Sequence, residues 1–209
     1  MLIKKRSFKN LFFDLWYKFG KPPWIIDEAQ PDLIAAAEKG EVCGPTVLDV
    51  GCGDGNNAIY LASRGFDVTG VDVSVNAIGI AKRNAFKAEV DVTFITLDAL
   101  KIGTLAKRFD TVIDFGLFHN FEGDDRERYV RALSNVCVGK GQLLMQCLGD
   151  KAGEYGVYPH RFGPQPLSQE GIRASFSEGW QIEWIRLGVC KSNLGVHYSS
   201  WLTAMKSTK

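Results

Sequence analysis

The chain has 209 residues, of which 45% are hydrophobic, and this is enough to bury the core of one domain. Lys and Arg (25) nearly balance Asp and Glu (24), so the basic surplus expected of a nucleic-acid-binding protein is missing. No apolar run reaches the roughly 20 residues that span a bilayer, and the five scattered cysteines lack zinc-ligand spacing. These features predict a reduced, metal-free cytoplasmic protein without a nucleic-acid or membrane partner.

Two helices are predicted before the first strand. Residues 4–19 form an amphipathic pattern in which Phe8, Leu11, Phe12, Leu15 and Phe19 recur at helical spacing. Pro22 and Pro23 end this helix, and a shorter helix follows at 32–39. We expect residues 1–45 to cover the open edge of a single domain that spans 1–209; contact of the basic first helix with a membrane surface is the less favoured alternative.

From residue 46 onward, short β-rich runs alternate with helical stretches, which is the pattern of parallel strands joined by crossover helices. The predicted strands are 46–50, 67–72, 92–97, 109–115 and 142–148, and the predicted helices are 56–64, 74–87 and 124–136. A further helix at 168–176 is followed by strand-like runs at 181–189 and 200–205. Because no helix separates these last two runs, we expect them to pair antiparallel.

The predicted fold class is therefore α/β. We expect a three-layer, Rossmann-like sandwich with a mostly parallel seven-stranded sheet and one antiparallel strand near the C-terminus. The Gly- and Pro-rich segment 153–166, which contains His160, reads as a loop on the ligand side of the sheet.

The most informative motif follows the first predicted strand. Gly51, Cys52 and Gly53 form a glycine-rich turn that opens a helix, where a ligand can approach bare backbone. Asp72 ends the next strand, at the spacing where a carboxylate accepts the ribose hydroxyls of an adenosine. Together these residues predict an adenosine-binding site.

Asp49 decides which adenosine ligand is favoured. A carboxylate beside the turn would repel a pyrophosphate but suits the cationic amino acid end of S-adenosylmethionine (SAM). Asn56 also stands where the dinucleotide fingerprint wants a third small residue, and no Gly-Lys-Ser/Thr follows as in a triphosphate loop. SAM is the predicted cofactor.

The run 47–55 (VLDVGCGDG), with VDVS at 71–74, resembles motif I and its acidic partner in class I SAM-dependent methyltransferases. This resemblance implies cofactor contacts from Val73, from Asp98 and Ala99 near the adenine, and from Phe115 at the end of the fourth strand. Taken with the turn, the predicted cofactor residues are Asp49, Gly51, Cys52, Gly53, Asp72, Val73, Asp98, Ala99 and Phe115.

Further motifs resemble the thiopurine and thiol methyltransferase-like group that acts on small molecules. They are Pro23-Trp24 with Gln30-Pro31, the run 116–121 (GLFHNF), and Ser168 with Ile172-Arg173 and Phe176. The chain departs from that group after Trp24, where Ile25-Ile26-Asp27 replaces the usual Asp-Gly. The resemblance implies a thiol, hydroxyl or ring nitrogen of a small aromatic or heterocyclic molecule as the methyl acceptor.

His119 is the candidate catalytic residue, because it follows the fourth strand at the ligand-binding edge. A neutral imidazole there would either accept a proton from the acceptor or orient it. Trp24, Phe118 and Phe121 are predicted to contact the substrate together with His119. His160 and His197 carry no predicted role, and Cys52 is expected to pack its thiol without acting as a nucleophile.

Three other functions remain open from the sequence. An NAD-dependent oxidoreductase predicts a third small residue in the glycine turn and a parallel final strand. A nucleic-acid methyltransferase predicts a basic groove, and in the adenine N6 class an Asn/Asp-Pro-Pro-aromatic run where residues 115–118 read FGLF. A non-catalytic SAM-binding protein is separated only by measuring turnover. The oligomeric state is expected to be a monomer or a weak homodimer.

Overall fold

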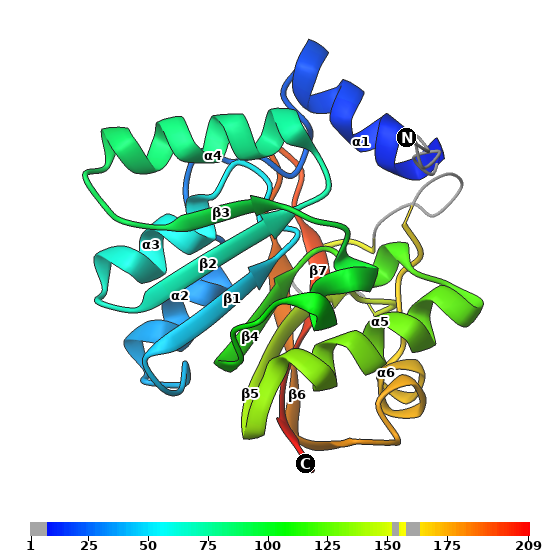
Figure 1. The fold of residues 1–209 in the computed structure, drawn as a ribbon. Coiled ribbons are helices and arrows are strands. Elements are labelled where there is room, and N and C mark those ends of the chain that lie inside the picture. The colour runs from blue at the N-terminus through cyan, green and yellow to red at the C-terminus, as the bar shows by residue number, and fades with distance from the viewer. Residues whose placement is uncertain (1–7, 152–154, 158–163) are drawn as a thin grey trace.

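The structure is a computed structural model, and it describes residues 8–151, 155–157 and 164–209. It forms a seven-stranded sheet in the order β3-β2-β1-β4-β5-β7-β6 (Figure 1). The strands are β1 (Thr46–Val50), β2 (Asp67–Asp72), β3 (Thr93–Thr96), β4 (Phe109–Phe115), β5 (Cys137–Leu148), β6 (Trp180–Cys190) and β7 (Tyr198–Ser207). Only β7 runs antiparallel to its neighbours, which confirms the predicted sheet.

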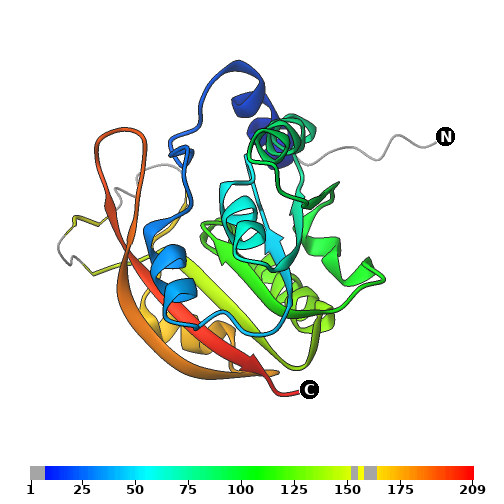
Figure 2. The same cartoon turned by 90° about the vertical axis from the view of Figure 1, so that its left-hand side faces the viewer.

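Helices cover both faces of this sheet and complete the predicted three layers (Figures 1 and 2). The helices are α1 (Phe8–Phe19), α2 (Pro31–Glu38), α3 (Asn56–Ser63), α4 (Val75–Lys87), α5 (Gly123–Val136) and α6 (Gln169–Ser175). Buried side chains of α2, α3 and α4 share one hydrophobic cluster, and those of α5 and α6 share another. The sheet therefore separates two cores.

Local sequence explains where the crossover helices begin and end. The Ser74 side chain accepts a hydrogen bond from the Ala77 amide at 3.0 Å, so it caps the N-terminus of α4. Gly65 lies just beyond the end of α3 with φ of 92°, a left-handed conformation that favours glycine. Serine and glycine are residue types favoured at these two cap positions, so local sequence sets both helix ends.

Strand β5 begins earlier than predicted. The sequence indicated residues 142–148, whereas the strand runs from Cys137 to Leu148. Its pairing with β4 shifts register between the Phe109–Cys137 and Thr111–Gln142 partners, so residues between them bulge from the ladder. Glycines on both sides of Lys140, which has φ of 61°, made this bulge resemble a turn in the sequence.

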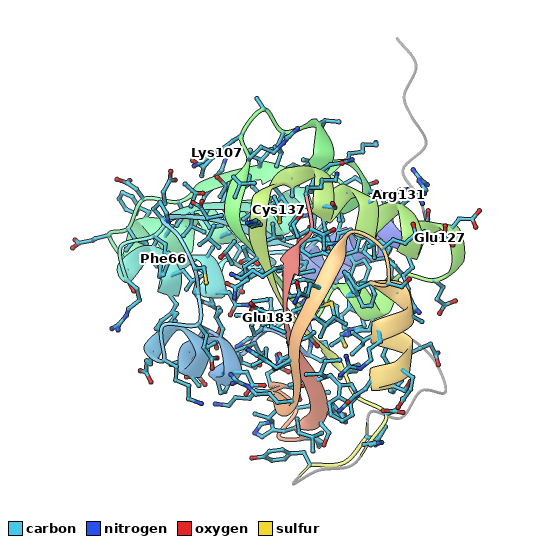
Figure 3. All side chains as sticks on the ribbon, turned by 90° about the horizontal axis from the view of Figure 1, so that it is seen from below. Phe66, Lys107, Glu127, Arg131, Cys137 and Glu183 are labelled. Atoms are coloured by element: carbon cyan, nitrogen blue, oxygen red, sulfur yellow. The ribbon has the colours of Figure 1, made fainter. Side chains whose placement is uncertain are left out.

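Two short 3-10 helices, η1 (Ala99–Thr104) and η2 (Phe118–Asn120), follow β3 and β4 at the carboxyl edge of the sheet and were not predicted. Helix α1 lies beyond this same edge (Figure 1). The opposite edge, where Phe66 precedes β2 and Cys137 begins β5, faces the viewer in Figure 3, with the charged side chains of Lys107, Glu127 and Arg131 directed outward. In the part of the chain that the structure describes, no helix is both long and apolar enough to cross a membrane.

Candidate functional site

The glycine-rich turn after β1 is built from backbone conformations that side chains disfavour. Gly51, Gly53 and Gly55 have φ of 74°, 55° and 84°. A Cβ on Gly51 would also lie 3.1 Å from the Leu117 side chain, which follows β4. The glycines of the turn, residues 51–55, thus leave backbone without side chains where neighbouring groups approach closely; we call this turn the glycine bend.

Three amides of the glycine bend already donate hydrogen bonds inside the protein. Gly51 and Cys52 both donate to the Val71 carbonyl, at 2.8 and 3.0 Å, and Gly53 donates to the Asp72 carboxylate at 3.0 Å. A phosphate-binding loop needs such amides directed at its ligand. Because these amides already have acceptors and carboxylates lie close by, the bend is unsuited to bind a pyrophosphate.

Asp49 lies beneath the bend in β1 and is 1% exposed. Its Oδ2 atom is buried and forms no hydrogen bond with any described residue. Burial, followed by the nearby carboxylates of Asp114, Asp72 and Asp54, raises the pKa of Asp49 to about 8. A buried carboxyl oxygen without a partner is costly, and a cationic group over the bend would relieve that cost.

Asp72 is held at the end of β2 by two amides. Its Oδ2 accepts from Gly53, and its Oδ1 accepts from Ser74 at 2.8 Å. The carboxyl group is thereby oriented while each oxygen keeps a further lone pair for a ligand hydroxyl. Val73 follows at the same edge and is half-buried.

Asp98 lies at the same edge, where the Leu97 amide donates to the Asp72 carbonyl at 2.9 Å. Its side chain accepts from the Leu100 amide at 3.0 Å and caps η1, which begins with Ala99. Asp98 therefore has a structural task, and Ala99 is placed beside the ends of β2 and β3. The predicted cofactor residues thus follow four neighbouring strands, β3, β2, β1 and β4, the last ending in half-buried Phe115.

Asp114 organises the segment after β4, and the sequence reasoning missed it. The residue is fully buried; its Oδ1 accepts from the Leu117 and Phe118 amides at 2.8 and 3.2 Å, and its Oδ2 accepts from the Tyr129 hydroxyl at 2.9 Å. Burial raises the pKa of Asp114 to about 6, although these hydrogen bonds lower it in part. Asp114 fixes the turn that carries His119.

His119 is 6% exposed and occupies η2. Its Nδ1 accepts a hydrogen bond from the Leu148 amide at 3.2 Å, and burial lowers its pKa to about 4. The ring is therefore neutral at physiological pH and carries its proton on Nε2. The neighbouring Cε1 atom lies 3.9 Å from the position of a Cβ on Gly116, so this edge of the ring faces the turn after β4.

The predicted substrate aromatics separate into different environments. Phe118 is 0% exposed and packs between Tyr129 and Phe176 in the core, with ring centroids 6.4 and 5.1 Å away. The expectation that Phe118 contacts substrate is therefore corrected, because η2 turns its ring inward. Phe121 is half-buried against Tyr129, with centroids 4.5 Å apart.

Trp24 is 39% exposed and contacts Tyr17, whose hydroxyl lies next to Gly53 of the bend. Its indole is parallel to that of Trp16, with an interplanar angle of 2° and centroids 5.2 Å apart, and its Nε1 donates to the Tyr17 hydroxyl at 2.8 Å. The turn that carries Trp24 is tethered to the β6–β7 hairpin, where Asn193 donates from Nδ2 to the carbonyls of Pro22 and Ile25 at 2.8 and 2.9 Å.

The thiol of Cys52 is buried, and burial raises its pKa, in agreement with a packing role. His197 lies near the hairpin, with its ring 5.5 Å from that of Tyr155. His160 and most of the predicted loop 153–166 lie outside the described residues. All five cysteines are free thiols.

Comparisons with known proteins agree with this geometry. A family model described as a methyltransferase domain matches residues 47–141. The 2-heptyl-1-hydroxyquinolin-4(1H)-one methyltransferase of Mycobacteroides abscessus is 34% identical over 166 residues, which cover 78% of this chain and 70% of that protein. The ubiquinone biosynthesis O-methyltransferase of Coxiella burnetii is 29% identical over 144 residues, covering 68% and 60%.

Solved structures extend the similarity. One, described for the conversion of a disulfide bond into a thioacetal group during echinomycin biosynthesis, is 33% identical with a TM-score of 0.83 and covers 95% of this chain and 92% of that chain. The magnesium protoporphyrin IX methyltransferase of Synechocystis PCC 6803 with bound SAM is 22% identical with a TM-score of 0.63, covering 84% and 76%. At that identity the second likeness concerns the fold.

Proposed function

This chain belongs to the SAM-dependent methyltransferases, and from that premise we propose that it methylates a thiol, hydroxyl or ring nitrogen of a small aromatic or heterocyclic molecule. The finer assignment to the thiopurine and thiol methyltransferase-like group is part of this proposal. It is supported by the sequence motifs around Trp24 and His119. The relative from Mycobacteroides abscessus, whose name describes a hydroxylated heterocycle as its substrate, supports the same class of acceptor.

The residues around the glycine bend fit the cofactor. The unpartnered Oδ2 of Asp49 suits the ammonium of SAM, directly or through a water molecule, and Asp72 is oriented to accept ribose hydroxyls. Gly51 and Gly53 carry no side chain, so a ligand can approach their backbone closely, with Cys52 between them. We assign Val73, Asp98, Ala99 and Phe115 to the adenosine end, as the family resemblance implies.

When bound, SAM supplies a methyl group on a sulfonium, so transfer to an electron pair of the acceptor leaves a neutral thioether. Little covalent help from the protein is required for such a displacement. The chain's own contribution is to align the acceptor with the methyl group, which can lower a barrier by up to about 7–11 kcal/mol, and to exclude water. We propose residues 1–45 as the cover that does this, over a catalytic core formed by 46–209.

His119 is the residue that we expect to orient the acceptor. Because its Nδ1 is occupied by the Leu148 amide and its pKa is about 4, the ring has no free basic nitrogen at neutral pH. It would therefore act as an Nε2–H donor to an acceptor oxygen, nitrogen or sulfur, and the proton of the acceptor would pass to solvent. Of the two roles that the sequence left open, the geometry favours orientation.

The NAD-dependent alternative is not favoured. The bend has no free amides for a pyrophosphate at Gly51, Cys52 or Gly53, and β7 is antiparallel. A nucleic-acid substrate is disfavoured by the near-balanced charge. A non-catalytic SAM-binding protein is not favoured either, because the matching family model and the relative that covers most of this chain are both described as methyltransferases.

The observation that carries the aromatic acceptor is the flat, partly exposed surface of Trp24 next to the bend. We would incubate the protein with methyl-labelled SAM and a panel of hydroxylated heterocycles, aromatic thiols, phenols and aliphatic thiols. Trp24→Ala should raise KM for flat acceptors, whereas Phe86→Ala, which removes another exposed aromatic from α4, should not. Transfer to aliphatic thiols alone would contradict the proposal.

A further inference from the structure

The phenol of Tyr17, a residue of α1, closes over the glycine bend. Tyr17 is 7% exposed, whereas Phe12 and Phe19 of the same helix are 46% and 76% exposed. A Cβ on Gly53 would lie 2.5 Å from the Tyr17 hydroxyl oxygen and 3.6 Å from its Cζ. The hydroxyl therefore rests directly on the bare backbone of the bend.

The hydrogen bonds of this hydroxyl are incomplete. Its oxygen accepts from Trp24 Nε1 at 2.8 Å, so the O–H proton remains to be donated. Burial, followed by the charge of Asp72, raises the pKa of Tyr17, so the group stays a phenol. Among the described residues it donates to no acceptor, and a buried donor in this state indicates that a ligand atom completes it.

The hydroxyl and the Asp72 carboxylate flank the same glycine. The Gly53 amide donates to Asp72 Oδ2 at 3.0 Å, while the Tyr17 oxygen touches the position of a Gly53 Cβ. A sugar lying on the bend would therefore meet an acceptor, Asp72, and a donor, Tyr17, around one residue.

We propose that Tyr17 is a cofactor-positioning residue that donates a hydrogen bond to a ribose oxygen of SAM and so makes α1 part of the cofactor site. This inference rests on the assignment of the glycine bend as that site.

The position of α1 over the bend is set by a polar latch to α4. Asp14 Oδ1 accepts from the Ser74 hydroxyl at 2.6 Å and from the Asn76 amide and side chain at 3.2 and 3.0 Å. The carboxylate thus caps the N-terminus of α4, two residues after Asp72. The same short segment after β2 therefore positions both α1, through Asp14, and the Asp72 carboxylate that is proposed to accept the ribose hydroxyls.

The test measures dissociation constants by calorimetry for Tyr17→Phe, which keeps the ring and removes the hydroxyl. The ligands are SAM, its demethylated product S-adenosylhomocysteine, and 5′-methylthioadenosine, which keeps the ribose but lacks the amino acid. Loss of one hydrogen bond should weaken all three by about five- to tenfold. Tyr60→Phe is the matched control, because its hydroxyl is buried without a partner, and it should leave all three unchanged.

Asp14→Asn offers a second variant that leaves the phenol intact. By loosening the latch it should weaken the same three ligands and shift the tryptophan fluorescence contributed by Trp16 and Trp24. Unchanged or tighter binding by Tyr17→Phe would overturn the proposal, as would a loss confined to the two ligands that carry the amino acid. If the wild-type protein bound none of the three ligands, the assignment of the glycine bend as the cofactor site would be wrong. If the wild-type protein bound them and Tyr17→Phe bound them equally well, only the role of Tyr17 would be wrong.

Discussion

Asp49 gives a direct test of how the glycine bend recognises a cationic ligand. With a pKa of about 8, roughly nine in ten Asp49 carboxyls are protonated at pH 7 in the ligand-free protein. An ammonium beside Oδ2 favours the carboxylate, so binding should expel the proton. Because release becomes easier as the pH rises, the affinity for SAM should increase about ninefold from pH 6 to pH 7.

Calorimetry in buffers of different ionisation enthalpy at pH 7 measures this directly. SAM and S-adenosylhomocysteine, which both carry the ammonium, should each release about 0.9 proton on binding. 5′-Methylthioadenosine, which lacks it, should release almost none, and Asp49→Asn should abolish the release. Equal proton release by all three ligands would refute the reasoning, because the ammonium would then not be what Asp49 meets.

The same carboxyl should make the ligand-free protein less stable at higher pH. Its folded-state pKa lies above the unfolded value of 3.8, so its contribution to folding is complete below about pH 4 and is lost as the pH rises to about 8. Each pH unit in that window costs up to about 1.4 kcal/mol. Asp49→Asn should therefore flatten the decline of Tm between pH 5 and pH 8, and an unchanged slope would show that Asp49 does not titrate there.

Three further changes test the other side of the site. His119→Ala should lower kcat/KM by roughly tenfold or more, and His119→Gln should retain a larger share of the activity because its amide can donate a hydrogen bond in place of Nε2. The pH profile of the wild-type protein should show no histidine inflection near pH 6.5; an inflection there would indicate that His119 acts as a base. Phe118→Ala should cost about 3–5 kcal/mol in urea unfolding through a core cavity, with KM little changed in the folded fraction; a KM effect without lost stability would return Phe118 to the substrate site. Tyr129→Phe should cost about 1.5–3 kcal/mol by removing a hydrogen bond to the Asp114 carboxylate, and a smaller loss would mean that the two amides suffice.

The fold was predictable because hydrophobic runs and caps are local signals. Ser74 and Gly65 mark helix ends by their own chemistry, and the absence of a crossover before β7 determined its direction. The start of β5 was missed because a bulge around Lys140 uses the same glycines as a turn. The sequence alone cannot show whether such glycines end a strand or interrupt it.

The site was predictable only where it follows a strand. Asp49 and Asp72 are placed by the ends of β1 and β2, so their spacing from the glycines located them. Tyr17 was not predicted from the sequence, since its contact with Gly53 depends on how α1 packs on α4. Phe118 was assigned to the substrate because of its place in the chain, but a 3-10 turn held by Asp114 directs its ring into the core.

The tether between Asn193 and the turn after α1 has a consequence for ligand exchange. The amide of Asn193 secures the carbonyls of Pro22 and Ile25 to the strand hairpin, so this side of the turn is anchored to the sheet. We therefore expect α1 to rotate about the Pro22–Pro23 segment as a hinge, while the turn that follows stays bound to Asn193. S-adenosylhomocysteine would then be released without breaking the hydrogen bonds between the strands of the sheet.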